Sequence, residues 1–149
     1  MSKLRAFYFL GFIFLNSQVF GEESLKNLPQ KKIKLCDHEF LAWVAATDES
    51  RQKGLMNFRP LKSNEAMLFI FESEEERSFW MKNVPYDLDI AFFKKNKKLV
   101  SQKTMKGTSP LTQEIALPVY SSEGTAMYAL EVAGGGLKKI SSKCTLKFN

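Results

Sequence analysis

Beyond residue 32, much of the chain consists of short stretches in which apolar and polar residues alternate. A period of two is typical of a β-strand that buries one face against a core. The pattern predicts strands at 33–36, 40–46, 67–71, 78–82, 88–93, 99–105, 125–132 and 144–148. Their order along the chain favours an antiparallel meander, so we expect a mainly β domain.

Two short segments are expected to be helical. Thr47 is a suitable N-cap, acidic residues follow it in the first turn, and Gly54 ends a helix of one to two turns. A further helical turn is expected at 137–140. The acidic run 72–77 is predicted to be a solvated turn. The long connection 106–124 is expected to fold over the motif that precedes it.

Side chains suited to ligand binding are concentrated in residues 78–93, SFWMKNVPYDLDIAFF. Trp80 and Lys82 share one face of a strand, which Asn83 and Pro85 then interrupt. Two aspartates lie opposite the aliphatic face of the next strand, and a third carboxylate occurs in a later strand. With one arginine from the predicted helix, the candidate binding residues are Arg51, Trp80, Lys82, Asn83, Asp87, Asp89 and Glu131.

Several motifs of this chain resemble one bacterial and archaeal family. They are RQKGLM at 51–56, MLFIF at 67–71, FWMKN and LDIAF within 79–92, and YALEVAGG at 128–135. In this order they are similar to the family catalogued as domain of unknown function 192, over roughly Phe40 to Ile140. The resemblance implies a compact antiparallel sandwich or barrel resembling a small jelly roll, but no settled activity.

The N-terminal segment reads as a secretory signal peptide over residues 1–21. Lys3 and Arg5 precede an apolar run at 6–15 that is shorter than the ~20 residues of a membrane-spanning helix. A permanent anchor is the alternative. We expect cleavage after Gly21, a flexible lead-in at 22–32, and a single β domain at 33–149. This organisation predicts a periplasmic or secreted protein with no stable membrane span.

Cys36 and Cys144 are the only two cysteines in the chain. An even number of cysteines in an exported protein predicts a disulfide bond, which would join the first strand to the last. The alternative is a metal site that also uses His38, but it would have too few ligands.

The charge of the chain is modestly basic. Removal of Lys3 and Arg5 lowers the count of Lys and Arg from 22 to 20 against 16 acidic residues, which leaves +4. The lysines are scattered in turn-like segments, so the balance favours solubility over nucleic-acid binding. We expect a monomer with no nucleic-acid partner.

The first functional hypothesis is a non-catalytic binding module of the cell envelope. Trp80 would supply an apolar platform for a small polar ligand or an envelope glycan, and the polar candidates would orient that ligand. The alternative interpretation is that Trp80 belongs to the core and that the aspartates hold turns.

Two other hypotheses involve chemistry. Paired carboxylates among Asp87, Asp89 and Glu131 could divide acid and base roles on an envelope polymer. Soft thioether ligands could hold Cu(I), and the methionines within the family-like motifs are Met56, Met67 and Met81. A core role for these methionines is the competing interpretation. The glycines at 134–136 lack a dinucleotide-binding pattern, so no cofactor is expected.

Overall fold

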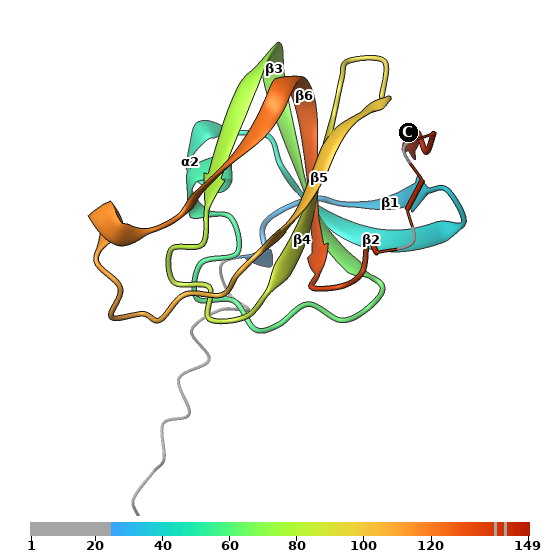
Figure 1. Ribbon diagram of the computed structural model, residues 1–149. Helices are drawn as coiled ribbons and strands as arrows, with labels where there is room; N and C mark the ends of the chain where they lie inside the picture. The colour runs from blue at the N-terminus through green and yellow to red at the C-terminus, as the bar shows by residue number, and fades with distance from the viewer. Residues whose placement is uncertain (1–24, 139, 142) are drawn as a thin grey trace, which may run out of the picture.

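The structure, a computed structural model, describes residues 25–138, 140–141 and 143–149. One seven-stranded sheet forms the body of the molecule and curls into a half-barrel (Figure 1). This architecture confirms the mainly β fold. The strands are β1 (Gln30–Leu35), β2 (His38–Ala45), β3 (Glu65–Trp80), β4 (Leu88–Phe93), β5 (Leu99–Met105), β6 (Val119–Ala133) and β7 (Leu146–Lys147). The helical elements among them are α2 (Asp48–Lys53) and the 3₁₀ turn η1 (Glu114–Ala116).

The strand order is β5-β4-β6-β3-β2-β1-β7. All pairs are antiparallel except β2 with β3, which run parallel. This pair corrects the fully antiparallel expectation, because α2 and the loop after it form the crossover connection that a parallel pair requires. The meander prediction is also wrong, since β6 inserts between β3 and β4. Among the described strands, β1–β2 and β4–β5 form the two predicted hairpins, and β2–β3 is the one other pair that is adjacent in both sequence and sheet.

The two edges of the sheet meet at one point. A single antiparallel bridge joins Lys98, before β5, to Thr145, before β7. The Leu146 amide also donates to the Lys97 carbonyl at 3.0 Å. Curling of the sheet therefore brings its edge strands together and protects them.

Alternation along the central strands divides the core between the two faces of the sheet. Met67, Phe69 and Ile90 belong to one apolar cluster, while Leu68 and Ala91 belong to the other. The six residues of β4 are all buried, because both of its faces are covered. The first of these two clusters extends toward α2 and provides the walls of the candidate site.

The acidic segment 72–77 is part of β3, which corrects the prediction of a turn. In Figure 1, β3 and β6 rise together toward the top of the view as a paired ribbon. Their register shifts between Ile70 and Glu75 and again between Glu76 and Ser78. Residues 72–76 are exposed. Acidic side chains are tolerated there because they remain in water.

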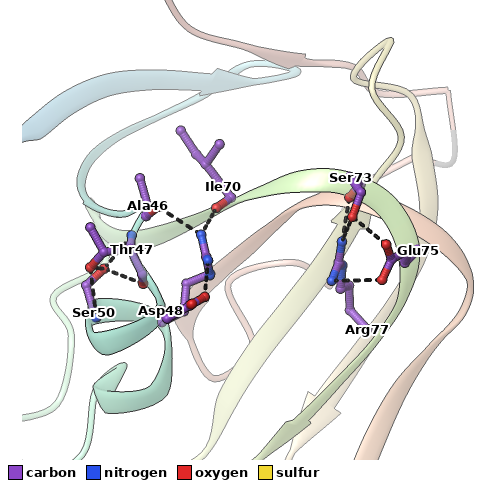
Figure 2. Close-up of polar contacts among 9 residues, drawn as sticks. Ala46, Thr47, Asp48, Ser50, Ile70, Ser73, Glu75 and Arg77 are labelled. Atoms are coloured by element: carbon purple, nitrogen blue, oxygen red, sulfur yellow. Dashed lines mark hydrogen bonds and ion pairs between the residues drawn. The ribbon is translucent and has the colours of Figure 1, made fainter.

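The predicted helix after Thr47 is confirmed. Thr47 forms a capping box with Ser50, in which the Thr47 hydroxyl accepts the Ser50 amide at 3.2 Å (Figure 2). Gly54 follows the helix with a φ of 48°, in the left-handed region that favours glycine. These local signals fix both ends of α2.

The first part of the chain differs in part from expectation. The predicted signal peptide at 1–21 lies outside the described residues. The predicted flexible lead-in at 22–32 is too long, because Leu25 is only 2% exposed within the core and β1 begins at Gln30. No helix within the described ranges is long and apolar enough to cross a membrane.

Cys36 and Cys144 form the expected disulfide, with their Cα atoms 5.2 Å apart. Cys36 immediately follows β1, and Cys144 precedes β7. The bond therefore fastens the short C-terminal strand to the edge of the sheet, beside the point where its two edges meet.

Candidate functional site

A cavity of about 340 Å³ lies between α2 and the long strand β3. Apolar side chains from β3, β4 and the turn after β3 form most of its walls, chiefly Phe69, Phe71, Phe79, Trp80, Met81 and Leu88. The ionisable groups that line it are Arg51, Lys53, Glu76, Arg77, Lys82 and Glu131. Its volume lies within the range of roughly 300–1,000 Å³ that is usual for small-molecule sites.

Glu131 is the buried ionisable group of this cavity. It lies on β6, where it pairs with Ile90 of β4 on one side and Met67 of β3 on the other. Its side chain therefore lies on the same apolar face of the sheet as theirs. Only 4% of its surface is exposed. Its carboxyl forms no hydrogen bond or ion pair with any described residue. Every side-chain oxygen of the described residues that is fully covered has a hydrogen-bond partner. Because the Glu131 carboxyl has no such partner, its oxygens are not fully covered and face the open space of the cavity.

Burial raises the pKa of Glu131 to about 8, because the ionised form loses its hydration inside the protein. The carboxyl is therefore mainly protonated at neutral pH. A protonated carboxyl can both donate and accept a hydrogen bond. Glu131 thus offers a neutral polar group in an apolar cavity.

Two arginines lie near the Phe71 ring at one side of the cavity. The guanidinium carbons of Arg77 and Arg51 lie 4.1 and 5.4 Å from the centre of the Phe71 ring. Arg51 donates to the carbonyls of Ala46 and Ile70, both at 2.8 Å. These bonds join α2 to β3, so Arg51 has a structural role as well as a place in the lining.

Arg77 fastens the bent part of β3. Its Nε donates to the Ala126 carbonyl at 3.2 Å, and another of its nitrogens donates to the carbonyl of Ser73. Figure 2 shows Arg77 beside Ser73 and Glu75, across the bend of β3. Sequence reasoning missed this residue because it placed 72–77 in a solvated turn. The available signal was a single cation within an acidic run.

Lys82 covers the ring that was expected to serve as a platform. Its ammonium lies 5.3 Å from the centre of the Trp80 ring and 2.5 Å from a carboxylate oxygen of Glu114. Glu114 belongs to η1 in the long loop before β6. Thr108 of the same loop donates its amide to the Val84 carbonyl at 2.9 Å. The loop therefore packs against the segment 78–93, as expected.

The other three candidates lie outside the cavity lining. Asn83 occupies a turn with φ of 55°, where its carbonyl accepts the Asn57 amide at 2.9 Å. Asp87 is exposed and lies 2.7 Å from the Lys106 ammonium. That hydrogen bond, followed by one from the Gly107 amide, lowers the pKa of Asp87.

Asp89 is buried, but on the opposite face of the sheet from Glu131. Its carboxylate accepts hydrogen bonds from the Thr104 hydroxyl at 2.8 Å and from the Leu137 amide at 2.9 Å. Asp89 pairs with Val132 in the β4–β6 ladder, one position away from Glu131. Because successive side chains alternate between faces, the two carboxyl groups point apart.

The three methionines of the copper hypothesis divide between the cavity and the core. Met56 and Met81 line the cavity, but Met67 does not. Met67 and Met81 are fully buried in the same apolar cluster, where methionine commonly fills irregular space. No group of three or more His, Cys, Asp or Glu side chains in the part of the chain that the structure describes is placed to hold a metal ion.

Comparison with solved structures identifies relatives of the same fold. A proposed transcription regulator from Sinorhizobium meliloti 1021 matches with a TM-score of 0.70 and 22% identity, over 81% of this chain and 95% of that one. A protein of unknown function from Novosphingobium aromaticivorans DSM 12444 matches with a TM-score of 0.71 and 22% identity, over 83% and 88%. At these identities the likeness shows the fold alone.

No curated protein matches this chain. A family model described as Uncharacterized ACR does match, over residues 31–144. That span contains each motif on which the resemblance was based, together with the cavity and both cysteines. The chain therefore belongs to the family of domain of unknown function 192.

Proposed function

We propose that this chain is an exported domain that binds a small molecule in the cavity beside Glu131. The observation that carries the proposal is the Glu131 carboxyl, which is 4% exposed and forms no bond to any described residue. Burial of a polar group without a partner costs about 1–3 kcal/mol. A ligand that supplies the missing hydrogen bond would offset this cost.

The character of the walls favours a ligand with an apolar body over a glycan. Phenylalanine, tryptophan, methionine and leucine side chains form much of the walls of the cavity that Glu131 lines, and a ligand with an apolar body would bury more of this surface than a sugar would. The Trp80 ring is approached by the Lys82 ammonium, which competes with a sugar for its face. We therefore narrow the hypothesis of a small polar ligand to a small amphiphilic one.

The carboxylate-dependent enzyme is less well supported by the geometry. Asp87 pairs with Lys106 at the surface, and Asp89 is fixed by Thr104. Neither shares a cavity with Glu131. A pair of acid and base groups acting on one substrate would have to lie in one site.

A fragment screen tests the binding proposal. Small aromatic and alicyclic molecules would be added singly to the purified protein, and the midpoint of thermal unfolding would be measured. We expect a subset to raise the midpoint in wild type but not in Glu131→Leu. This substitution removes the polar group while keeping an apolar side chain of similar size, so it should not unfold the protein.

Asp89→Asn provides the matched control, because it alters a buried carboxyl on the other face of the sheet. The fragments should stabilise this variant as they stabilise wild type. Equal shifts in wild type and Glu131→Leu would contradict the proposed site. The absence of any stabilising fragment would count against small-molecule binding by this domain.

Export is a separate part of the proposal. The Cys36–Cys144 disulfide supports it, because such bonds persist mainly in oxidising compartments. Expression of the full chain in a bacterium, followed by fractionation and intact-mass measurement, tests it. We expect a periplasmic or secreted species that begins near Glu22. An uncleaved species confined to the cytoplasm would contradict export.

A further inference from the structure

The charges around the cavity distinguish between classes of ligand. Its lining holds four cationic side chains, from Arg51, Lys53, Arg77 and Lys82. The acidic members are Glu76, which is exposed at the mouth, and Glu131, which is buried. Carboxylates outside the lining pair with three of these cations, since Asp48 lies beside Arg51, Glu75 beside Arg77 and Glu114 beside Lys82. Lys53 is the lining cation that has no acidic partner among the described residues.

Two of the aromatic rings that line the site, Phe71 and Trp80, are already in contact with cations of the protein. Arg77 and Arg51 approach Phe71, at 4.1 and 5.4 Å from the ring centre. Lys82 approaches Trp80 at 5.3 Å. Sites that bind ammonium ligands rely on free aromatic faces. A cationic ligand would therefore find these two rings already in contact with cations and would meet the ammonium of Lys53.

The lysines at the mouth differ in their partners. Lys53 is exposed, and its ammonium has no ion pair or hydrogen bond with any described residue. Lys82 pairs with Glu114, which is 55% exposed on the loop before β6. An incoming carboxylate could bind Lys53 directly and could replace Glu114 at Lys82. Ammonium groups commonly bind carboxylates through such charge-assisted hydrogen bonds.

Building on the proposed function, we infer that the ligand of this cavity is a small organic acid. Its carboxylate lies at the mouth with Lys53 and Lys82, and its apolar body contacts Phe79 and the neighbouring rings. A polar oxygen at its inner end exchanges a hydrogen bond with Glu131. The ligand thus supplies a hydrogen-bond partner for Glu131 and a carboxylate for the lysines at the mouth of the cavity.

Three probes that share a hydroxyphenyl body test the charge class. They are 4-hydroxyphenylacetate, which is anionic, tyrosol, which is neutral, and tyramine, which is cationic. Their dissociation constants for the full chain would be measured by calorimetry at pH 6.5, where Glu131 is protonated. We expect the acid to bind about tenfold or more tightly than the amine, with the alcohol between them.

Variants then locate the origin of this preference. Lys53→Met and Lys82→Met should each weaken binding of the acid severalfold and leave tyrosol unchanged. Glu114→Gln should bind the acid at least as tightly as wild type, because Lys82 loses its competing partner. Glu131→Leu should weaken all three probes, since each presents the same hydroxyl to the cavity.

The outcomes separate the two proposals. Tightest binding of tyramine, with Glu131→Leu still weakening it, would overturn the organic acid and leave the cavity as a small-molecule site. A preference for the acid that survives both lysine substitutions would also overturn this inference. Binding that is unaffected by Glu131→Leu would instead remove the proposed site itself.

Discussion

Glu131 and Asp89 are both buried carboxyl groups, but they differ in what surrounds them. Asp89 accepts two hydrogen bonds, from Thr104 and the Leu137 amide. Glu131 has no described partner and faces the cavity. One carboxyl is therefore part of the framework, whereas the other is maintained at a cost in stability. Substitution of Asp89 should therefore lower the free energy of unfolding, whereas a neutral substitution of Glu131 should raise it.

The cost of Glu131 should appear as a pH dependence of stability. The pKa of this carboxyl rises from an ordinary value of 4.5 to about 8 on folding. The folded protein then holds more protons than the unfolded chain between these limits. The contribution of Glu131 to stability should therefore be most favourable below about pH 4.5 and fall as pH rises toward 8, by about 1.4 kcal/mol per unit at most.

Urea unfolding of wild type and Glu131→Gln measures this contribution. The neutral amide cannot ionise, so the difference in unfolding free energy between variant and wild type should move in favour of the variant from pH 5 to pH 8.5. A difference that stays constant over this range would show that Glu131 titrates normally in the folded protein.

Asp89→Ala should destabilise the protein by about 2–3 kcal/mol, because it leaves the Leu137 amide and the Thr104 hydroxyl without their acceptor. Asp89→Asn should cost less, since it retains one oxygen. Chemical denaturation with tryptophan fluorescence measures both values. A change below about 0.5 kcal/mol for Asp89→Ala would contradict its role as an anchor of the 134–138 turn.

The separate roles of these residues could not be derived from the sequence. Alternation places the Asp89 side chain opposite those of Leu88 and Ile90, although β4 begins at Leu88 and leaves Asp87 outside the strand. Alternation alone does not indicate whether Glu131 of β6 lies on the same face of the sheet as Asp89 of β4. The pairing of Ile90 with Glu131 decides it, and this register arises from tertiary contacts between strands far apart in the chain.

At the scale of elements, the bend of β3 determines the shape of the site. The strand enters the sheet at Glu65, departs from regular pairing after Ile70, and ends at Trp80. The bend carries Phe71 and Phe79 to the same cavity. Arg77 fastens it by bonds to Ser73 and Ala126.

Arg77→Lys should destabilise the protein by about 1–2 kcal/mol. Lysine retains the charge but lacks the planar fork that binds two carbonyls while lying over Phe71. Glu75→Gln is the control, because its exposed carboxylate lies 3.8 Å from Arg77 and contributes little. Equal stability of Arg77→Lys and wild type would show that charge alone suffices at this position.

Sequence signals indicate where strands and helices occur better than they indicate how far each strand extends. The N-cap at Thr47 and the glycine at position 54 fixed α2 at both ends. The pattern predicts separate strands at 67–71 and 78–82, and the acidic residues between them conceal that β3 runs from the first through to Trp80 in the second. Charge indicates exposure to water, and an exposed segment can still be a strand when one neighbour pairs with it.

At the scale of the whole molecule, closure of the sheet depends on contacts between the ends of the domain. The Cys36–Cys144 bond spans 108 positions in sequence. It joins β1 to the segment that leads into β7. The predictable part of this architecture was its β class and the disulfide. The parallel β2–β3 pair and the insertion of β6 were not predictable, because both depend on long-range pairing.

Replacement of both cysteines by serine should lower the unfolding free energy by about 4–5 kcal/mol, because the unfolded chain is released from a large closed loop. Urea unfolding of oxidised wild type and of the double variant measures the difference. Reduced wild type should behave as the variant does. Equal stability of all three would show that the bond is not needed to hold the edges of the sheet together.

The central claim is that Glu131 is a buried carboxyl that the protein leaves unpaired at a ligand cavity. The most direct test is a pH titration of its carboxyl carbon by ¹³C NMR, with the resonance assigned by its absence from Glu131→Gln. The structure predicts a single titration with a midpoint near 8. A midpoint in the ordinary glutamate range of about 4–5 would contradict the claim, because it would show a solvated or paired carboxylate.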